Sequence, residues 1–385
     1  MKQLHVFSVF GTASGFFDGQ FRYLHEQGND IYLICSNAED TEAFCERNHV
    51  HFYPVEISRS ISPIADIKAI NEVKKFIVKN NIDVVFGHTP KGALVAMTAA
   101  KLAGVKKRIY YRHGVIYTTA KGLKRLVLKL EEQLVSALST KIINVSHSLS
   151  RLALKDHLNK DRKQYVIGRG TCGGIDAEKL FNPASLDTER LESLRHTLNL
   201  DKADVVFGFC GRICNDKGVP ELVDAFEIFQ KTHQGLNARL LLIGRFDVRD
   251  GVSDVVRKKI ENNENIVLTG RVGKQDIPYY YSLLDVFVFP SHREGFGMCV
   301  LEASAMEKPI LVSHAHGCED SIIENETGLY IPLNAEGICD GMGKMLNEDL
   351  RKRLGTAGRE MVVEYYDYSV MWPAVKKLYD EILKK

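Results

Sequence analysis

The sequence lacks several features that would assign it to a common class of protein. It contains no stretch of about 18 apolar residues, so it offers no candidate transmembrane helix. Its first residues do not have the layout of a signal peptide. None of its 8 cysteines forms a C-x-x-C pair, which excludes the commonest zinc and dithiol motifs. We therefore expect a cytoplasmic protein with reduced thiols.

The common nucleotide-binding motifs are absent as well. Gly11 and Gly15 form a predicted turn after the first strand, but they do not make G-x-G-x-x-G. The second predicted strand, residues 30–35, ends without the acidic residue that would hold an adenosine ribose, so NAD binding is not favoured. The phosphate loop G-x-x-x-x-G-K-[ST] does not occur, and no nucleic-acid-binding motif accompanies the basic segments.

The composition is that of a globular α/β protein with room for two domains. The chain has 385 residues, of which 45% are hydrophobic and 26% are charged. Apolar runs alternate with helical patterns, for example a strand at residues 4–10, a helix at 16–27 and a strand at 107–112. This alternation predicts parallel sheets, whose ligand sites lie at the carboxyl ends of the strands.

Positive charge is concentrated in one part of the first half. Residues 101–150 contain 10 basic and 2 acidic side chains, although the net charge of the whole chain is only +2. Within them, residues 121–130 have leucines and basic residues at helical spacing. Such a segment can lie on an anionic membrane through Lys121, Lys124, Arg125 and Lys129. It can equally be a surface helix whose leucines pack inward on the sheet, and both interpretations can hold together.

The stretch at residues 291–306 has the strongest functional pattern. It follows an apolar strand and passes through a turn at Glu294, Gly295, Phe296 and Gly297 before a helix that contains Glu302. Free backbone N–H groups at a helix N-terminus suit a phosphate, and carboxylates accept strong hydrogen bonds from hydroxyls. Phosphate and hydroxyl groups together indicate a nucleotide sugar.

A second phosphate-binding pattern follows the strand predicted at residues 205–210. There the chain reads G-R-x5-K-G, with Arg212 offering a planar fork to a diphosphate and Lys217 a point charge. A diphosphate needs such cations, above all where no metal is bound. The alternative is a turn with two solvated cations.

Together these motifs resemble glycosyltransferase family 4, whose members have the GT-B fold and retain the anomeric configuration. The resemblance rests on S-x-x-E-G-F-G-x-x-x-L-E-A, and the run H-T-P-K-G…Y-x-x-H-G resembles the capsule and O-antigen branch of the family. It implies two Rossmann-like domains facing across a cleft. The acceptor domain would be residues 1–170 with a returning helix at 365–385, and the nucleotide-sugar domain residues 171–364.

The resemblance also implies roles for individual residues. The leaving phosphate of the nucleotide sugar would take the acceptor's proton, so that no protein base and, without a D-x-D sequence, no metal or other cofactor is required. The implied catalytic residues are His113, Glu294, Arg212 and Lys217. Those implied to bind the nucleotide sugar are Gly11, Gly15, Arg271, Val272, Gly295, Phe296, Gly297 and Glu302, and those suggested for the acceptor are Arg59, His88 and Lys91.

The branch suggests the substrates and the place of the reaction. The expected partners are a UDP-sugar, possibly carrying an N-acetylhexosamine, a polyprenyl-diphosphate-linked acceptor and the anionic inner face of the cell membrane, with no nucleic acid. One alternative is a family member with a soluble acceptor, and another is a non-catalytic partner that binds nucleotide sugars. A hydrolase with Glu294 and Glu302 as its acid and base is disfavoured, because one of them lies beside phosphate-binding elements.

Overall fold

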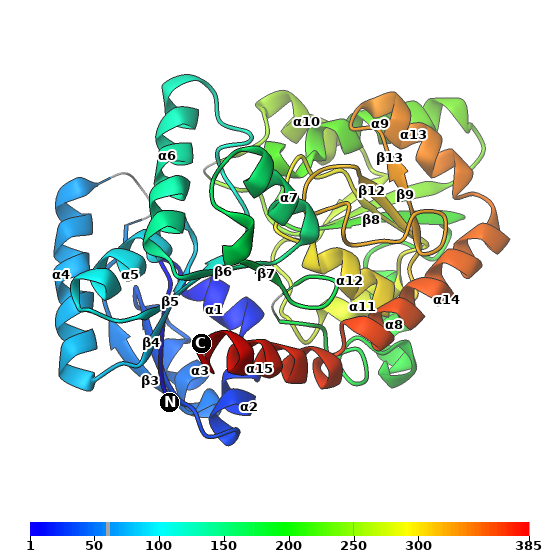
Figure 1. The fold of residues 1–385 in the computed structure, drawn as a ribbon. Helices are drawn as coiled ribbons and strands as arrows, with labels where there is room; N and C mark the ends of the chain where they lie inside the picture. The colour runs from blue at the N-terminus through cyan, green and yellow to red at the C-terminus, as the bar shows by residue number, and fades with distance from the viewer. Residues whose placement is uncertain (59–61, 172, 249, 385) are drawn as a thin grey trace. The chain divides into compact units, whose positions relative to one another are not determined.

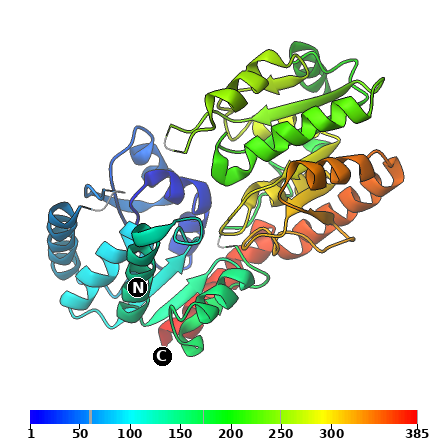
Figure 2. The ribbon, with the colours of Figure 1, turned by 90° about the horizontal axis from the view of Figure 1, so that it is seen from above.

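The computed structural model describes residues 1–58, 62–171, 173–248 and 250–384, and the chain divides into two compact units. Unit 1 comprises Met1–Gly174 together with Ser369–Lys385, and unit 2 comprises Ile175–Tyr368. Each unit has a parallel β-sheet with helices on both faces (Figures 1 and 2). The predicted fold class, two Rossmann-like units, is confirmed.

The sheet of unit 1 has seven strands in the order β3-β2-β1-β4-β5-β6-β7. The direction of winding reverses between β1 and β4, and such a switch point is where open α/β sheets bind ligands, at the carboxyl ends of the strands. The strands are β1 (Lys2–Val6), β2 (Asp30–Cys35), β3 (Val50–Pro54), β4 (Val84–His88), β5 (Lys107–Arg112), β6 (Lys141–Asn144) and β7 (Gln164–Val166).

Small residues allow the central helix of unit 1 to lie close to the sheet. A Cβ added to Gly87 would stand 2.8 Å from the Cα of Ala93, so only glycine fits there. The helices of the unit are α1 (Phe10–Phe16), α2 (Gln20–Glu26), α3 (Thr41–Asn48), α4 (Pro63–Asn80), α5 (Pro90–Leu102), α6 (Gly122–Leu138), α7 (His147–Lys155) and α15 (Tyr368–Lys384).

The start of the chain differs from the prediction. The first strand ends at Val6, and helix α1 begins at Phe10, so Gly11 and Gly15 lie inside a short helix and not in a glycine turn. Neither glycine has a positive φ, whereas Gly19 does, at 79°, and it separates α1 from α2. The apolar run did not reveal this boundary, because Phe7 and Phe10 are buried whether they belong to a strand or a helix.

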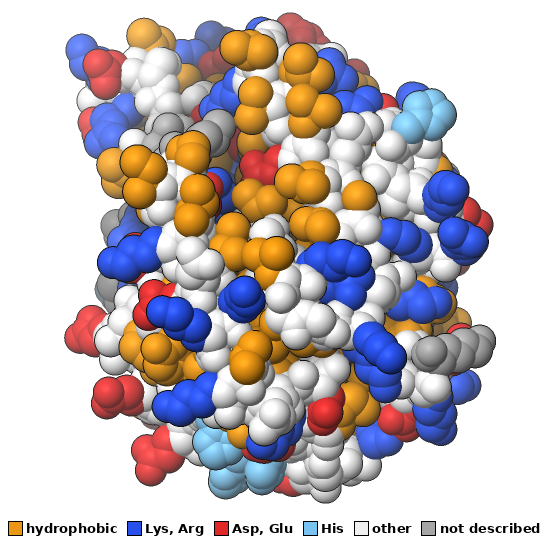
Figure 3. Space-filling view, turned by 60° about the vertical axis from the view of Figure 1, so that its left-hand side comes forward, with side chains coloured by type: hydrophobic (Ala, Val, Ile, Leu, Met, Phe, Trp, Pro, Cys, Tyr) orange, Lys and Arg blue, Asp and Glu red, His pale blue; other side chains and the backbone are white. Residues whose placement is uncertain are grey.

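Helix α6 contradicts the alternative in which its leucines pack inward on the sheet. Leu123, Leu126, Val127, Leu130 and Leu134 lie on one stripe and are exposed, Leu123 by 76%. The second half of the helix is the anchored part, because Glu132, Val135 and Ser136 are buried. Figure 1 shows the first turns of α6 extending beyond the rest of unit 1, and in Figure 3 hydrophobic side chains gather at the same height, with basic side chains nearby.

No helix in the described part of the chain is both long enough and apolar enough to cross a membrane.

The sheet of unit 2 has six strands in the order β10-β9-β8-β11-β12-β13, with its switch point between β8 and β11. Sequence analysis missed its edge strand, β13. The strands are β8 (Val205–Cys210), β9 (Ala238–Ile243), β10 (Ile266–Leu268), β11 (Val286–Phe289), β12 (Ile310–Ser313) and β13 (Gly328–Ile331). The helices are α8 (Thr188–Thr197), α9 (Val219–Thr232), α10 (Asp254–Asn262), α11 (Ile277–Ser282), α12 (Met298–Ala305), α13 (Ala335–Lys344) and α14 (Glu348–Tyr365).

The last helix belongs to unit 1 although it follows unit 2 in the chain. It begins at Tyr368 and not at residue 365, because α14 ends at Tyr365. Its Tyr379 hydroxyl lies 3.0 Å from that of Tyr111, and the Trp372 indole donates to the carbonyl of Gly173 at 3.0 Å. Val375, Ile382 and Leu383 are buried.

Candidate active site

In unit 2 the two predicted phosphate motifs meet at the switch point of the sheet. The Arg212–Lys217 loop follows β8, and the loop with Glu294 follows the neighbouring strand β11. Gly218 has a φ of 67°, and a Cβ there would stand 1.9 Å from the carbonyl oxygen of Pro290, so the two loops touch only because this residue is glycine.

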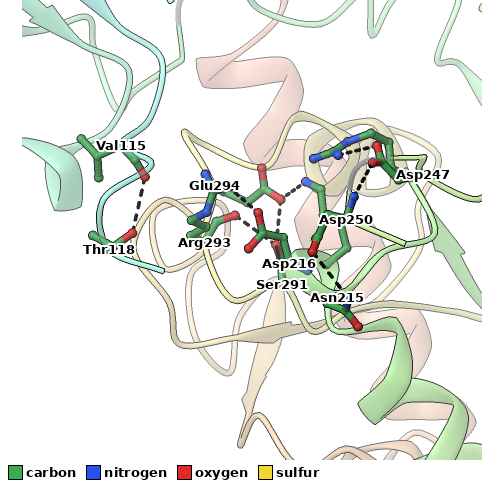
Figure 4. A network of polar contacts seen from close by, with 11 residues as sticks. Val115, Thr118, Asn215, Asp216, Asp247, Asp250, Ser291, Arg293 and Glu294 are labelled. Carbon is green, nitrogen blue, oxygen red and sulfur yellow. Dashed lines mark hydrogen bonds and ion pairs between the residues drawn. The ribbon is translucent and has the colours of Figure 1, made fainter. Parts of the chain in front are cut away.

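Lys217 and Glu294 form an ion pair at this junction. Figure 4 shows Glu294 beside Ser291 in this network. The hydroxyl of Ser291 also donates to Oε1 of Glu294 at 2.9 Å, and the Lys217 ammonium lies 5.1 Å from the centre of the Phe289 ring. Burial acts to lower the pKa of Lys217, but the Glu294 carboxylate outweighs it and keeps the pKa above its ordinary value. Two groups predicted for catalysis are therefore brought together, each held by the other.

Arg212 lies nearby with a different partner. Its guanidinium is 2.6 Å from Oδ2 of Asp247, and 53% of its side chain is exposed, so an anion from solution can reach it. Arg293 pairs in turn with Asp216, whose backbone N–H donates to Asp250 at 2.8 Å. Figure 4 shows Asp216, Asp247 and Asp250 in one network with Arg293.

Sequence analysis missed these supporting groups. Asp216 and Ser291 lie inside the two motifs, and Asp247 and Asp250 follow the carboxyl end of β9. The rule that ligand sites lie past strand ends could have drawn attention to the two aspartates. Their pairing with particular cations depends on loop conformations that a motif does not specify.

The turn before α12 is built as predicted, with Glu294 in the loop and Glu302 on the helix. Gly297 caps α12 with a φ of 80° and makes no side-chain cap hydrogen bond. Phe296 is buried, with its ring 5.5 Å from that of Tyr366, so only its backbone can contact a ligand. A helix N-terminus of this kind suits an anion.

Glu302 is a half-buried carboxylate on the second turn of α12. The hydroxyl of Tyr281 donates to its Oε2 at 2.8 Å. Burial raises the pKa of Glu302 to about 7, against smaller lowering effects from the Tyr281 hydrogen bond and Lys274. The loop after β10, where nucleotide contacts were predicted, holds an exposed Arg271 and a partly buried Val272.

Two predicted residues of unit 1, His88 and His113, contact each other, and His88 also contacts His5, which sequence analysis did not single out. His88 ends β4, and its Nδ1 lies 3.0 Å from Nε2 of His113, just past β5. On its other side, Nε2 of His88 lies 3.0 Å from Nδ1 of His5, on β1. His88 is fully buried, whereas His113 is partly exposed, so a ligand could touch His113 directly and His88 only through it.

The other acceptor residues are less available than expected. Lys91 is buried and forms an ion pair with Asp66 of α4. Arg59 lies outside the described residues. Of the four basic residues of α6, Lys121, Lys124 and Arg125 are exposed, and Lys129 lies 3.9 Å from Asp156.

Two family models match this chain. The family model described as "Glycosyl transferases group 1" matches residues 192–361, and the model "Glycosyl transferase 4-like" matches residues 6–146. The first covers the motifs of unit 2, and the second covers His88 and His113.

Individual relatives match over nearly their whole length. A capsular polysaccharide biosynthesis glycosyltransferase of Staphylococcus aureus is 31% identical over 369 residues, which cover 95% of this chain and 94% of the relative. An Escherichia coli UDP-Gal:alpha-D-GlcNAc-diphosphoundecaprenol alpha-1,3-galactosyltransferase is 24% identical over 94% of this chain and 92% of its own. The crystal structure of a Rickettsia africae glycosyltransferase matches the fold with a TM-score of 0.79 at 21% identity, covering 100% of this chain and 99% of the other.

Proposed function

Because the chain belongs to glycosyltransferase family 4, the group 1 glycosyl transferases, and is therefore a retaining glycosyltransferase of GT-B fold, we propose that it moves a sugar from a UDP-sugar to a hydroxyl of a polyprenyl-diphosphate-linked saccharide. The Escherichia coli relative is named for a UDP-galactose substrate and a diphosphoundecaprenol-linked acceptor, which supports both substrate classes. The capsular relative supports a place in the assembly of a surface polysaccharide.

The observation that carries the proposal is the junction of Lys217, Glu294 and the N-terminus of α12. A bound diphosphate would draw the Lys217 ammonium from Glu294 and accept hydrogen bonds from the first N–H groups of α12. The released Glu294 carboxylate could then accept hydrogen bonds from sugar hydroxyls. Arg212, already exposed, would reach the same phosphates, and Glu302 would accept from ribose hydroxyls.

The reaction breaks the bond between the anomeric carbon and the β-phosphate oxygen, and it forms a bond from that carbon to the acceptor oxygen. The acceptor's proton goes to the leaving phosphate, so UDP departs with it. Charge accumulates on the phosphate in the transition state, where preorganised cations and N–H groups act most strongly. His113 would bind the sugar being transferred.

The acceptor lipid implies that the protein works at a membrane surface. The exposed apolar stripe of α6, with Lys121, Lys124 and Arg125 beside it, supports contact with an anionic bilayer. The stripe supports this more strongly than leucines packed inward would, because exposed leucines can enter the lipid interface.

The experiment that tests the proposal measures nucleotide release from UDP-, GDP- and ADP-sugars, with and without chelator and a polyprenyl-linked acceptor. We expect release from a UDP-sugar that depends on the acceptor and survives chelation. Lys217→Met and Glu294→Gln should each lower kcat by about 10²–10³. Lys231→Met and Glu336→Gln change exposed residues of the same unit and should have no effect.

The other outcomes separate the alternatives. Release that depends on a water-soluble acceptor would indicate a soluble substrate. Binding of UDP without release from any nucleotide sugar in the presence of acceptor would indicate a non-catalytic partner. Full activity of Glu294→Gln would contradict the site.

A further inference from the structure

Tyr281 is a fully buried tyrosine that contacts the Glu302 carboxylate. It lies on the short helix α11, shortly before the chain enters β11, and its neighbour Tyr280 is only partly buried. The ring of Tyr281 packs edge to face against Phe287 of β11, with 5.6 Å between the ring centres, and Phe181 lies 6.3 Å away. A buried tyrosine hydroxyl needs a hydrogen-bond partner, because leaving it unpaired is costly. The partner here is Oε2 of Glu302, at 2.8 Å.

This hydrogen bond orders a carboxylate that would otherwise rotate. Because the Tyr281 ring is packed and its hydroxyl holds Oε2, the Glu302 side chain is already ordered before a ligand binds. Oε1 accepts no hydrogen bond from the residues that the structure describes, and the Glu302 side chain is only half-buried, so a ligand can reach this oxygen. A carboxylate oxygen has two lone pairs, so Oε1 can accept from two neighbouring hydroxyls.

We propose that Tyr281 is a positioning residue of the nucleotide site, which holds the Glu302 carboxylate so that Oε1 accepts from the two ribose hydroxyls of the nucleotide. Tyr281 itself touches no ligand, because its side chain is fully buried. The inference rests on the proposed function where it assigns a ribose to Glu302. Its consequence is discrimination: the site favours a nucleotide with ribose hydroxyls over one without them, and this preference depends on the tyrosine hydroxyl.

The same hydrogen bond also favours the charged form of Glu302. Burial raises the pKa of Glu302 to about 7, and the Tyr281 hydroxyl acts against burial, because it donates to the carboxylate. Without that hydroxyl the pKa of Glu302 would lie higher, and near pH 7 more of Glu302 would be a neutral acid. A neutral acid is a weaker acceptor than a carboxylate. Tyr281 thus supports both the position and the charge of the acceptor.

The other ionisable groups around Glu302 do not replace this contact. Lys274 is exposed and lowers the pKa of Glu302 by its charge alone. The thiols of Cys210, at the end of β8, and Cys299, on α12, also lie close to Glu302, but burial raises the pKa of both, that of Cys210 to about 12, so both are neutral near pH 7. On α14, which packs against α12, Arg359 donates to backbone carbonyls. Among the described residues, only Tyr281 donates to the Glu302 carboxylate.

The test compares UDP with 2′,3′-dideoxyuridine 5′-diphosphate, which lacks both ribose hydroxyls, in calorimetric titrations of the full chain. The two nucleotides share their base and diphosphate, so the ratio of their Kd values reports the hydroxyl contacts alone. We expect the parent chain to prefer UDP about tenfold or more. Tyr281→Phe keeps the buried ring and should lower this preference about fivefold at pH 7, with little change in the Kd of the dideoxy analogue. The effect should be smaller at pH 8.5, because Glu302 is then mostly ionised in both proteins.

Two further variants show that the tyrosine acts through the carboxylate. Tyr280→Phe removes a hydroxyl from the neighbouring tyrosine and should leave the preference unchanged. In a Glu302→Gln background, where the preference is already reduced, Tyr281→Phe should have no further effect on it. Urea unfolding shows whether each variant is folded.

The outcomes separate this inference from the proposed function. An unchanged preference in Tyr281→Phe, or an equal weakening of both nucleotides, would overturn the positioning role while the UDP site stands. If Tyr281→Phe does not fold, the parent chain still decides, because equal affinity for the two nucleotides would leave no hydroxyl contact to position. Binding of neither nucleotide to the parent chain would overturn the proposed UDP-sugar substrate, and this inference with it.

Discussion

Glu302 is stabilised as a neutral acid in a place where the proposed reaction needs its carboxylate. Burial raises the pKa of Glu302 from its ordinary value of 4.5 to about 7. Between these values the folded protein binds a proton that the unfolded chain does not, so stability falls as the pH rises from 4.5 to 7. Above pH 7 the stability stays at this lower value. Such a cost at a binding site is common where function requires the charge.

We predict that Glu302→Gln is more stable than the parent chain by about 1–3 kcal/mol at pH 8, with the difference vanishing near pH 4.5. The glutamine oxygen can still accept from Tyr281, so that hydrogen bond is not lost. Urea unfolding at several pH values measures this difference. The control is Glu336→Gln, because the Glu336 side chain is exposed. A stability difference that did not change with pH would contradict the burial argument.

The ion pair of Lys217 and Glu294 leads to a second prediction at this scale. Lys217→Met leaves the Glu294 carboxylate without its cation, so the variant should both lose affinity for UDP and become less stable. The double variant Lys217→Met/Glu294→Gln also replaces the unpaired carboxylate by a neutral amide. It should recover stability but not binding, because the cation for the phosphate is still missing. Calorimetric titration with UDP and urea unfolding measure the two effects separately. Recovery of UDP affinity in the double variant would show that Lys217 does not bind the phosphate.

At the scale of single elements, α6 combines an anchored half with an exposed one. Its anchor is Arg112, fully buried on β5, which donates to Glu132 at 3.2 Å, to Asn144 at 2.9 Å and to Ser136 at 2.8 Å. We predict that Arg112→Met destabilises unit 1 by about 3–5 kcal/mol, because Glu132 becomes an unpaired buried charge. Arg112→Met/Glu132→Leu should regain most of this loss in urea unfolding. If the single variant lost no stability, the network would not be what holds α6.

The exposed half of α6 should be dispensable for stability but necessary for binding to membranes. Replacing Leu123, Leu126 and Leu130 by serine should change the free energy of unfolding by less than about 0.5 kcal/mol per residue, because these side chains are exposed. Binding to vesicles that contain anionic lipid should fall at least about tenfold, because a buried leucine contributes about 1.5–3 kcal/mol.

The control for this experiment is Val255→Ser, which removes an exposed apolar side chain from α10 in unit 2. Sedimentation with vesicles measures the binding. Equal sedimentation of the parent chain and the triple variant would contradict insertion of this stripe, and no sedimentation of the parent chain would favour a soluble acceptor.

The same elements show what could be read from the sequence. Apart from β13 and the end of β1, the strands of both sheets and the turn of Glu294 were predictable, because buried parallel strands are continuous apolar runs and glycines mark the turns. The orientation of the α6 leucines was not, because periodicity shows that a stripe exists but not what covers it. The pairing of Lys91 with Asp66 and the contact of His88 with His5 both join residues far apart in sequence, and neither has a local pattern.

At the scale of the whole molecule, the two predicted phosphate-binding motifs both lie in unit 2. We predict that UDP slows hydrogen exchange in the loops at residues 211–218, 269–272 and 291–298 and leaves the strands β1 and β4 of unit 1 unchanged. Saturation at about 100 times the Kd stabilises the binding unit by about 2.7 kcal/mol. Mass spectrometry of the exchanged peptides measures this. Protection confined to unit 1 would show that UDP binds there and would contradict the prediction.

The return of α15 to unit 1 also has a consequence during protein synthesis. Unit 2 is one uninterrupted segment of chain, Ile175–Tyr368, whereas unit 1 needs Ser369–Lys384 to cover Tyr111 and bury Tyr379. At about 5–20 residues per second, the ribosome takes on the order of ten seconds or more to make the intervening segment. The unit that is translated first is therefore the one completed last, and during that interval the nascent chain exposes an apolar surface that chaperones can recognise.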